Sequence, residues 1–258
     1  MGAHGGYGWK PDRPDPRDWQ GSLTLTEHAV TLPASVSLRA KMPAIYDQGQ
    51  LGSCTANAIA GALQYQQLVQ AETEGKNVPS RLFIYYNERV MEGTVSWDAG
   101  AEIRDGIKSV AKQGAPPESE WPYRITRFTD KPPAKAYTDA LQFRALTYAR
   151  PIRTSYYLRK ALANTHPIVF GFSVYSSFES DEVASNGIVP MPDVENEELL
   201  GGHAVVAIGY KQISGHLYFE VRNSWGADWG DNGYFWMPAA YLLDTSLSSD
   251  FWDIKLVE

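Results

Sequence analysis

Residues 223–234 read Asn-Ser-Trp-Gly-Ala-Asp-Trp-Gly-Asp-Asn-Gly-Tyr. The stretch closes on an Asp-Asn-Gly triplet, which predicts a tight turn because Asn and Gly accept backbone conformations that other residues avoid. Runs of β-type residues at 217–223 and 234–237 flank it, so we expect a strand, a turn and a second strand. Taken alone, Asn223 would be a turn residue and the two tryptophans would be core aromatics.

Two other segments contain residues that could form a catalytic site together with Asn223. One reads Gln48-Gly-Gln-Leu-Gly-Ser-Cys54, and the other reads Gly-Gly-His203-Ala followed by apolar strand residues. A nucleophilic thiol needs a base that ionises it, a group that orients the base, and donors for the oxyanion formed in acyl transfer. The sequence offers Cys54, His203, Asn223 and Gln48 for these roles. Each has a structural explanation when taken singly, and only their combination favours catalysis.

Cys54 is the single cysteine of the chain, and it lies at a predicted helix start. Residues 55–69 favour a helix with one apolar face, on which spacings of three to four residues place Ala58, Ala62, Tyr65 and Val69. Ser53 is a candidate N-cap. The thiol would then lie in the first turn, where unpaired N–H groups and the helix dipole stabilise a thiolate.

The rest of the chain divides into a helical and a β-rich half. Further helices are expected at 83–89, 101–112 and 156–163, and strands at 168–174 and 203–210 besides the two named above. Residues 1–37 are rich in Gly, Pro and charge, which opposes helix formation and indicates an extended arm. We therefore predict an α+β fold.

Composition excludes several classes of protein. The 258 residues include 43% hydrophobic residues but no apolar run long enough to span a membrane. The formal net charge is −7 and no basic stripe exists, so nucleic acid is not an expected partner. One cysteine allows no intramolecular disulfide, which fits a reducing compartment. With no signal peptide visible, the default expectation is cytoplasmic, and secretion by another route stays open. No histidine has ligand spacing, so neither metal nor cofactor is expected.

At these residues the chain resembles the papain family of cysteine peptidases. His203 follows Cys54 by about 150 residues, at the limit of the family's spacing of roughly 130 to 150. The resemblance covers residues 38–258 and implies a two-lobed fold, with a mainly helical lobe (38–142), a β-barrel-like lobe (143–258) and the active site in the cleft between them.

The resemblance implies a role for each matching residue. Cys54 would be the thiolate, His203 the imidazolium paired with it, and Asn223 the acceptor that orients the ring. Gln48 and the Cys54 N–H would form the oxyanion hole. A supporting Trp225 would shield the His203–Asn223 hydrogen bond. The substrate-binding candidates are Gly100 and Gly202.

The chain also departs from the family pattern. Leu51 stands where the family has a cysteine that forms a disulfide, and Thr55 replaces an aromatic beside the nucleophile. The extension at 1–37 is too short for the helical prodomain of many members. We hypothesise that its aromatic segment 7–19 lies along the cleft and restricts access.

The function implied is that of an endopeptidase, which hydrolyses peptide or protein substrates through a thioester. Two alternatives remain: a transpeptidase or crosslinking enzyme in which an amine accepts the acyl group, and a catalytically silent module that binds peptides. The sequence does not indicate an oligomeric state.

Overall fold

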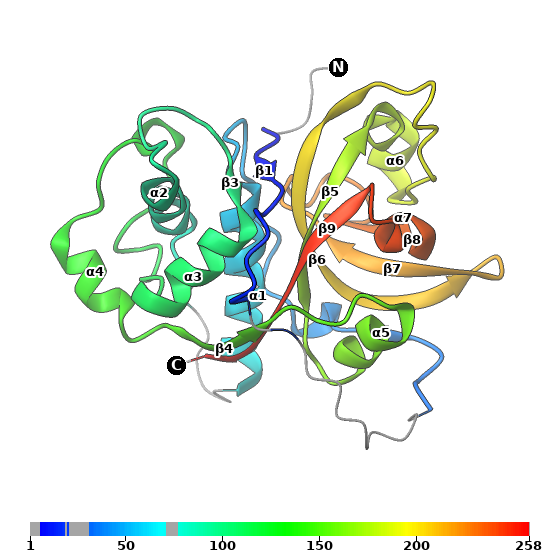
Figure 1. The fold of residues 1–258 in the computed structure, drawn as a ribbon, viewed down its shortest axis with the longest axis horizontal. Helices are drawn as coiled ribbons and strands as arrows, with labels where there is room; N and C mark the ends of the chain where they lie inside the picture. Colours follow the sequence, from blue (N-terminus) through cyan, green and yellow to red (C-terminus); the bar gives the residue numbers. More distant parts are fainter. Residues whose placement is uncertain (1–5, 19, 21–30, 71–76, 258) are drawn as a thin grey trace.

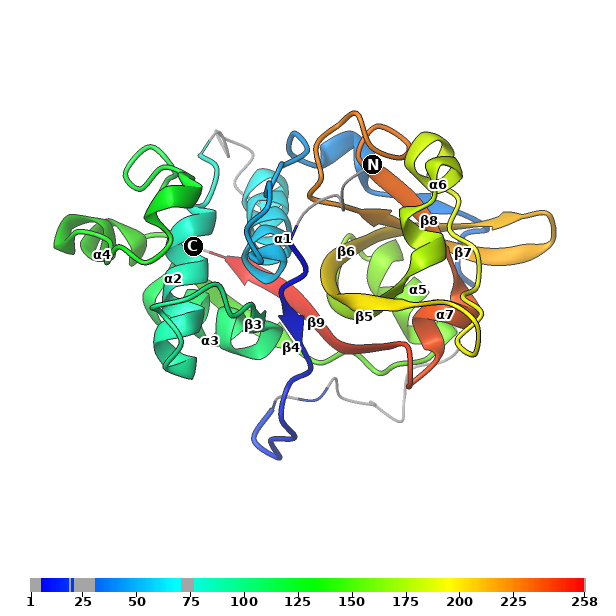
Figure 2. The same ribbon diagram turned by 90° about the horizontal axis from the view of Figure 1, so that it is seen from above.

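The structure is a computed structural model that describes residues 6–18, 20, 31–70 and 77–257, without the side chains of 146, 256 and 257. Two lobes lie side by side in it (Figures 1 and 2). One lobe contains helices α1 (Cys54–Gln70), α2 (Arg81–Glu92), α3 (Ile103–Gln113) and α4 (Ala134–Ala140). The expected helices at 55–69 and 83–89 are confirmed, each slightly longer than predicted.

The second lobe is built on a seven-stranded antiparallel sheet in the described part of the chain, with the order β4-β9-β5-β6-β7-β8 and β2 beside β6. Its strands are β2 (Val36–Ser37), β4 (Ala145–Ala149), β5 (Ile168–Tyr175), β6 (Leu199–Ile213), β7 (His216–Arg222), β8 (Tyr234–Pro238) and β9 (Ser248–Val257). Helices α5 (Ser155–Ala163), α6 (Asp181–Asn186) and α7 (Ala239–Leu243) pack around it. The α+β fold with two lobes is as expected.

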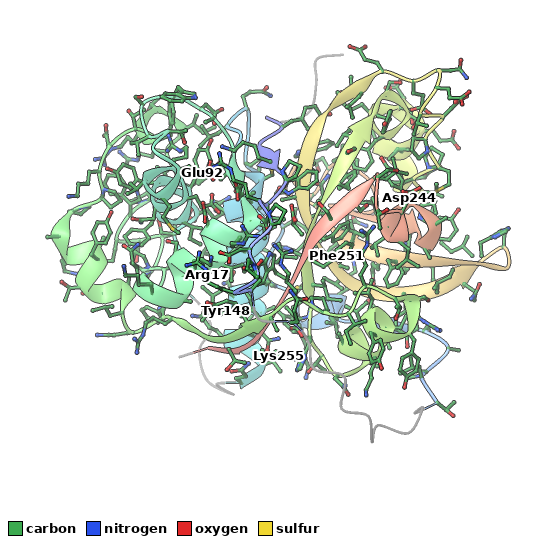
Figure 3. All side chains as sticks on the ribbon, viewed as in Figure 1. Arg17, Glu92, Tyr148, Asp244, Phe251 and Lys255 are labelled. Carbon is green, nitrogen blue, oxygen red and sulfur yellow. The ribbon has the colours of Figure 1, made fainter. Side chains whose placement is uncertain are left out.

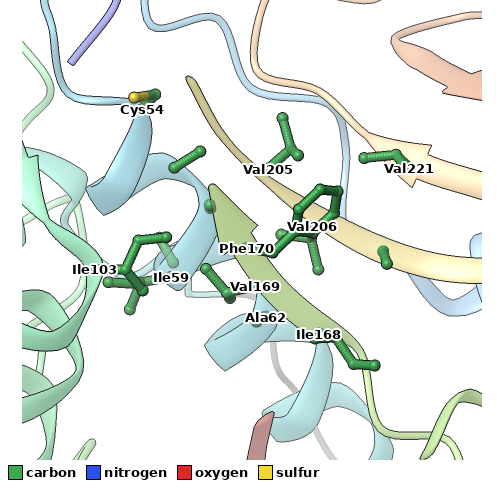
Figure 4. Close-up of a cluster of buried hydrophobic side chains, with 14 of the residues drawn as sticks. Cys54, Ile59, Ala62, Ile103, Ile168, Val169, Phe170, Val205, Val206 and Val221 are labelled. Carbon is green, nitrogen blue, oxygen red and sulfur yellow. The ribbon is translucent and has the colours of Figure 1, made fainter. Parts of the chain in front are cut away.

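Helix α1 forms the centre of the molecule. Every residue from Cys54 to Gln66 is buried, because the helix packs against α2 and α3 on one side and against β5, β6 and β9 on another. Figure 4 shows Ile59 of α1 between Ile103 of α3 and Val169 of β5, with Ala62 of α1 on the other side of Val169. Small residues in α1 allow this close approach on several sides, so the position of Cys54 is fixed by tight packing.

Two expectations need refinement. The helix expected at 101–112 begins at Ile103, because residues 101–102 form strand β3, which pairs in parallel with β1 (Trp9–Lys10) of the arm. The segment before α1 lies on the β-rich lobe, where Arg222 donates hydrogen bonds to the carbonyls of Pro43 and Ala44. Residues 43–44 therefore contact the β-rich lobe before the chain enters α1 at Cys54.

Residues 6–18 of the arm run along the boundary between the lobes (Figures 1 and 2). Figure 3 shows the side chains of Glu92 and Arg17 beside this boundary, and Lys10 of the arm is paired with Glu92 of α2. In the described residues, no helix is long and apolar enough to cross a membrane, and no group of three His, Cys, Asp or Glu side chains is placed to hold a metal ion.

Candidate active site

Cys54 is the first residue of α1 and is fully buried. Burial raises the pKa of its thiol to about 12, against the opposite effect of the backbone groups of Ala204, Gly8 and Thr55. The N–H groups favour the thiolate as the helix start predicts, but removal from water opposes the charge more strongly. In this covered state the sulfur is a thiol.

His203 lies on β6, one residue before Ala204. Its Nε2 lies 2.8 Å from Asn223 Oδ1, whereas its buried Nδ1 has no hydrogen-bond partner among the described residues. Burial lowers the pKa of the ring to about 4, against the opposite effect of the Asn223 bond. The ring is therefore neutral at pH 7, with Nε2 as the donor and Nδ1 free to accept a proton.

Trp225 lies against the imidazole, with ring centroids 4.9 Å apart and planes inclined by 30°. Asn223 is held at the end of β7 because its N–H donates to the carbonyl of Gly233, in the predicted turn. The stretch from 223 to 234 thus places an orienting amide and a covering indole on the same histidine. Shielding from water strengthens the hydrogen bond between His203 and Asn223.

Gln48 is fully buried beside this turn. Its Nε2 donates to the carbonyls of Gly6 and Leu51, both at 2.9 Å. Its Oε1 accepts from Ser224 Oγ at 2.6 Å, which fixes which way the amide points. Ser224 was not among the predicted site residues, although its position directly after Asn223 indicated that it lies in the site.

Thr55 also has a structural role that the sequence did not indicate. Its hydroxyl donates to Glu88 Oε2 at 2.9 Å, so the side chain points into the helical lobe and away from the cleft. Glu88 is fully buried, and burial raises its pKa well above the usual value. A phenylalanine or tryptophan at position 55 would remove the hydroxyl that donates to Oε2 of this carboxyl group.

The arm passes directly over these residues. Gly8 approaches Gly52 and Gly100 so closely that a Cβ on Gly8 would lie 1.7 Å from Gly52 O, and a Cβ on Gly100 would lie 2.1 Å from Gly8 O. The Ala101 N–H donates to Gly8 O at 2.7 Å. Gly100 has a φ of +67°, which glycine accepts without strain.

On the β-rich side, Tyr7 lies edge-on to His203 and Trp225, with centroid distances of 6.3 and 6.2 Å. Trp9 lies against Gly202, where a Cβ would be 2.5 Å from Trp9 O. The structure thus brings every candidate site residue of the sequence analysis around arm residues 6–9. Tyr7 and Trp9 belong to the aromatic segment that the cleft hypothesis named.

Acyl transfer to a cysteine needs three groups. They are a thiol at a helix start, an imidazole oriented by an amide, and a second amide that binds a peptide carbonyl. The fold and the site define a cysteine-dependent hydrolase. Residues 32–243 match the model of the papain family cysteine proteases, and the chain belongs to that family.

Known proteins agree with this assignment. The uncharacterized peptidase C1-like protein L477 of Acanthamoeba polyphaga mimivirus is 44% identical over 88% of this chain and 72% of its own length. Mouse pro-cathepsin H is 28% identical over 79% of this chain, which spans 59% of that relative. Among solved structures, xylellain, a cysteine protease from Xylella fastidiosa, has a TM-score of 0.88 and 41% identity, covering 99% of this chain and 97% of xylellain.

Proposed function

We propose that this cysteine peptidase is an endopeptidase that cleaves peptide bonds through a Cys54 thioester, and that its N-terminal arm covers the site in the state described here. One observation carries the proposal: His203 Nε2 is bound to Asn223 at 2.8 Å, and the backbone of Ala204, the residue after His203, acts on the Cys54 thiol and favours its ionised form. Nucleophile, base and orienting group are therefore contiguous.

In the reaction, His203 Nδ1 takes the thiol proton and Cys54 Sγ attacks the peptide carbonyl carbon. The Asn223 bond to Nε2 leaves Nδ1 as the nitrogen that exchanges the proton. Collapse of the tetrahedral intermediate breaks the C–N bond, and His203 gives the proton to the leaving amine. Water, deprotonated by the same nitrogen, then hydrolyses the thioester.

Contacts of the arm support the binding of a peptide main chain in the cleft. Gln48 Nε2 already donates to a peptide carbonyl, that of Gly6, at 2.9 Å. Ala101 N–H binds the Gly8 carbonyl, and the Gly49 carbonyl accepts from the Gly6 N–H at 3.3 Å. Main-chain bonds of this kind are independent of side-chain identity, which supports peptides and proteins as the substrates.

Coverage by the arm also accounts for the protonation state of the site. Cys54 and His203 are both fully buried beneath it, and burial raises the pKa of the thiol while lowering that of the ring. A thiolate–imidazolium pair needs a lowered pKa for the Cys54 thiol and a raised pKa for the His203 ring. We therefore infer that the reactive thiolate–imidazolium pair forms once the arm leaves and water or substrate enters.

The test is stoichiometric labelling of the full chain by a peptide-like thiol-reactive probe, with cleavage of a fluorogenic peptide measured in parallel. Cys54→Ala should abolish both signals, and His203→Ala should slow both. Equal labelling of wild type and His203→Ala would overturn the dyad. A chain that labels but cleaves no peptide would indicate the silent binding module.

The other alternative concerns the acceptor of the acyl group. Adding a primary amine to the cleavage reaction separates hydrolysis from transpeptidation, because both pathways consume the same thioester. We expect the hydrolysis product to predominate. A predominant aminolysis product at modest amine concentration would identify a transpeptidase or crosslinking enzyme instead.

A further inference from the structure

A glycine-rich turn joins the two donors of the candidate oxyanion hole. Gln48 supplies its side-chain amide and Cys54 its backbone N–H, and Gly49 and Gly52 lie between them. Gly49 has a φ of +59°. Glycine leaves the backbone more freedom than any other residue, so a turn of this composition does not hold one shape by itself. Contacts from outside the turn have to fix the position of the two donors.

One hydroxyl group, that of Tyr123, contacts both ends of this turn. Its Oη donates to the backbone carbonyl of Gln48 at 2.9 Å. The same Oη lies 2.5 Å from the Oγ of Ser53, the residue directly before Cys54. A carbonyl oxygen can only accept, so the tyrosine proton goes to Gln48 and Ser53 is the donor in the second bond. Tyr123 therefore bridges the start and the end of the turn.

Ser53 is held in turn from inside the helical lobe. Asn57, one helical turn further along α1, donates through Nδ2 to Ser53 Oγ at 3.1 Å and to the Ser53 carbonyl at 2.9 Å. Its Oδ1 accepts from Arg81 Nη1 at 3.1 Å. The hydrogen bonds thus run in one direction, and we call them the Tyr123 network. Its members, in order from the first donor to the last acceptor, are Arg81, Asn57, Ser53, Tyr123 and Gln48.

The cation at the head of the Tyr123 network is itself fixed. Arg81 is 9% exposed, and Glu118 accepts from its Nε at 2.9 Å and from its Nη2 at 2.8 Å. The guanidinium lies 4.1 Å from the centroid of the Tyr123 ring. It also donates to the carbonyl of Asp47, directly before Gln48, at 3.2 Å. A charged donor at one end polarises the hydrogen bonds that follow and strengthens them.

We propose that Tyr123 is a positioning residue for the oxyanion hole, which fixes the backbone of Gln48 so that its side-chain amide meets the oxyanion. Ser224 fixes the direction of the same amide from the β-rich side, and Tyr123 fixes its backbone from the helical lobe. The inference rests on the proposed peptidase function and deepens it, because an oxyanion donor acts where charge develops on the substrate carbonyl.

The Tyr123 hydroxyl should therefore matter for the rate of peptide cleavage. Misplacement by about 1 Å of a group that takes part in a reaction can cost about 10²-fold in rate. Without the hydroxyl, the Gln48 carbonyl and the Ser53 hydroxyl each lose one partner and the turn can shift. We expect a smaller loss, of about tenfold, because the Tyr123 ring and the Ser224 bond stay in place.

The experiment uses the full chain with Asp18→Ala, which breaks the buried ion pair between the arm and Arg104. Tyr123→Phe in this background removes the hydroxyl and keeps the ring beneath Arg81. The kcat for a fluorogenic peptide should fall about tenfold while KM stays within about twofold, because the oxyanion forms only after the substrate has bound. A small alkylating reagent forms no oxyanion, so the rate of Cys54 alkylation should stay the same.

Tyr137→Phe is the matched control. Tyr137 is a half-buried tyrosine of the same lobe, and its hydroxyl donates to Asn87 Oδ1 at 3.1 Å. Its ring packs against Phe83 with centroids 4.7 Å apart, so this substitution also removes one hydroxyl and keeps a packed ring. We expect its kcat to be unchanged. A loss of kcat in Tyr123→Phe no larger than in the control, or an equal loss of alkylation, would overturn the proposal.

Combination with Gln48→Ala shows whether Tyr123 acts through Gln48. Residues that act on one another give non-additive effects, so Tyr123→Phe should lower kcat by less than about threefold in a chain that already lacks the amide. The same loss of about tenfold in both backgrounds would show that Tyr123 acts on another group, against the assignment.

Active-site titration of Cys54 and thermal unfolding keep the two proposals apart. If even Asp18→Ala alone neither labels nor cleaves, the peptidase function fails and the role of Tyr123 fails with it. If Tyr123→Phe does not fold, Ser53→Ala removes the same bond from its other partner. That variant should lower kcat about threefold with alkylation unchanged. An unchanged kcat in a folded Ser53→Ala chain would then contradict the proposal.

Discussion

Asp18 of the arm and Arg104 of α3 form a buried ion pair with two parallel hydrogen bonds, Nε to Oδ1 at 3.0 Å and Nη2 to Oδ2 at 2.9 Å. The side chains are only 3% and 6% exposed. Removal of one partner of a buried pair leaves the other charge uncompensated. The pair therefore ties the covering arm to the helical lobe.

Asp18→Ala should release the arm more often. We expect the rate of Cys54 labelling in the full chain to rise by about a hundredfold, the factor for roughly 3 kcal/mol lost from a broken buried pair. Arg13→Ala is the matched control, because it lies on the same arm with a side chain 91% exposed, and it should leave the rate unchanged. Equal rates at equal Tm in wild type and Asp18→Ala would contradict a limiting role for the arm.

His203 should make the stability of the covered chain depend on pH. Burial lowers its pKa from 6.5 to about 4 in the folded protein, so the unfolded chain binds the extra proton between these values. The neutral His203 ring therefore contributes up to about 3 kcal/mol to the free energy of unfolding above pH 6.5, and this contribution is lost as pH falls towards 4. His203→Gln lacks this proton, so the Tm of wild type should fall relative to the variant in that window. Parallel Tm curves would contradict the assignment.

Glu88 should make the protein less stable as pH rises, which is opposite to the effect of His203. Burial raises its pKa well above 4.5, so unfolding releases a proton and the stability of wild type falls as pH rises above 4.5. Glu88→Gln keeps the shape and the acceptor for Thr55 without a charge to bury. We expect the variant to have the higher Tm at pH 8 and a smaller advantage at pH 4, measured by thermal unfolding. A lower Tm at pH 8 would show that the carboxylate has an undetected partner.

Gln48→Ala should lower kcat by about 10²- to 10³-fold, since it removes one oxyanion donor. Ser224 is a positioning residue that holds Gln48 through a 2.6 Å bond, so Ser224→Ala should lower kcat less and Ser224→Thr should restore most of it. A small alkylating reagent forms no oxyanion, so in chains that also carry Asp18→Ala, where the arm no longer limits access, the rate of Cys54 alkylation should be the same with and without each of the three substitutions. A parallel loss of alkylation would indicate a general disturbance of the site.

In the chain with Asp18→Ala, peptide cleavage should fall at both low and high pH. The active form requires thiolate and imidazolium together, and either one is lost at one end of the pH range. The measurement is kcat/KM across pH. A profile with no acid limb would argue against an ion pair and favour a neutral dyad.

Much of the site was predictable from the sequence because its signals are local. Helix α1 follows from apolar residues at helical spacing, and the strands around 223–234 follow from alternating β-type residues and turn residues. Strand β9 was not predicted. It carries a residue with positive φ at Asp250 and charges at Asp253 and Lys255, so it lacks a regular alternation, and its burial depends on partners on β4 and β5.

By itself the sequence determined the α+β class and the helix that carries Cys54. It also indicated His203, Asn223 and Gln48 as candidate site residues beside Cys54, because the short patterns that contain them occur together in one chain. Only the tertiary structure decided that Trp9 reaches Asp250 across nearly the whole chain, and that Ser224 fixes the amide of Gln48. Contacts between distant segments follow no repeating pattern in the sequence, so they cannot be predicted from it. They become visible only when the lobes and the arm are packed together.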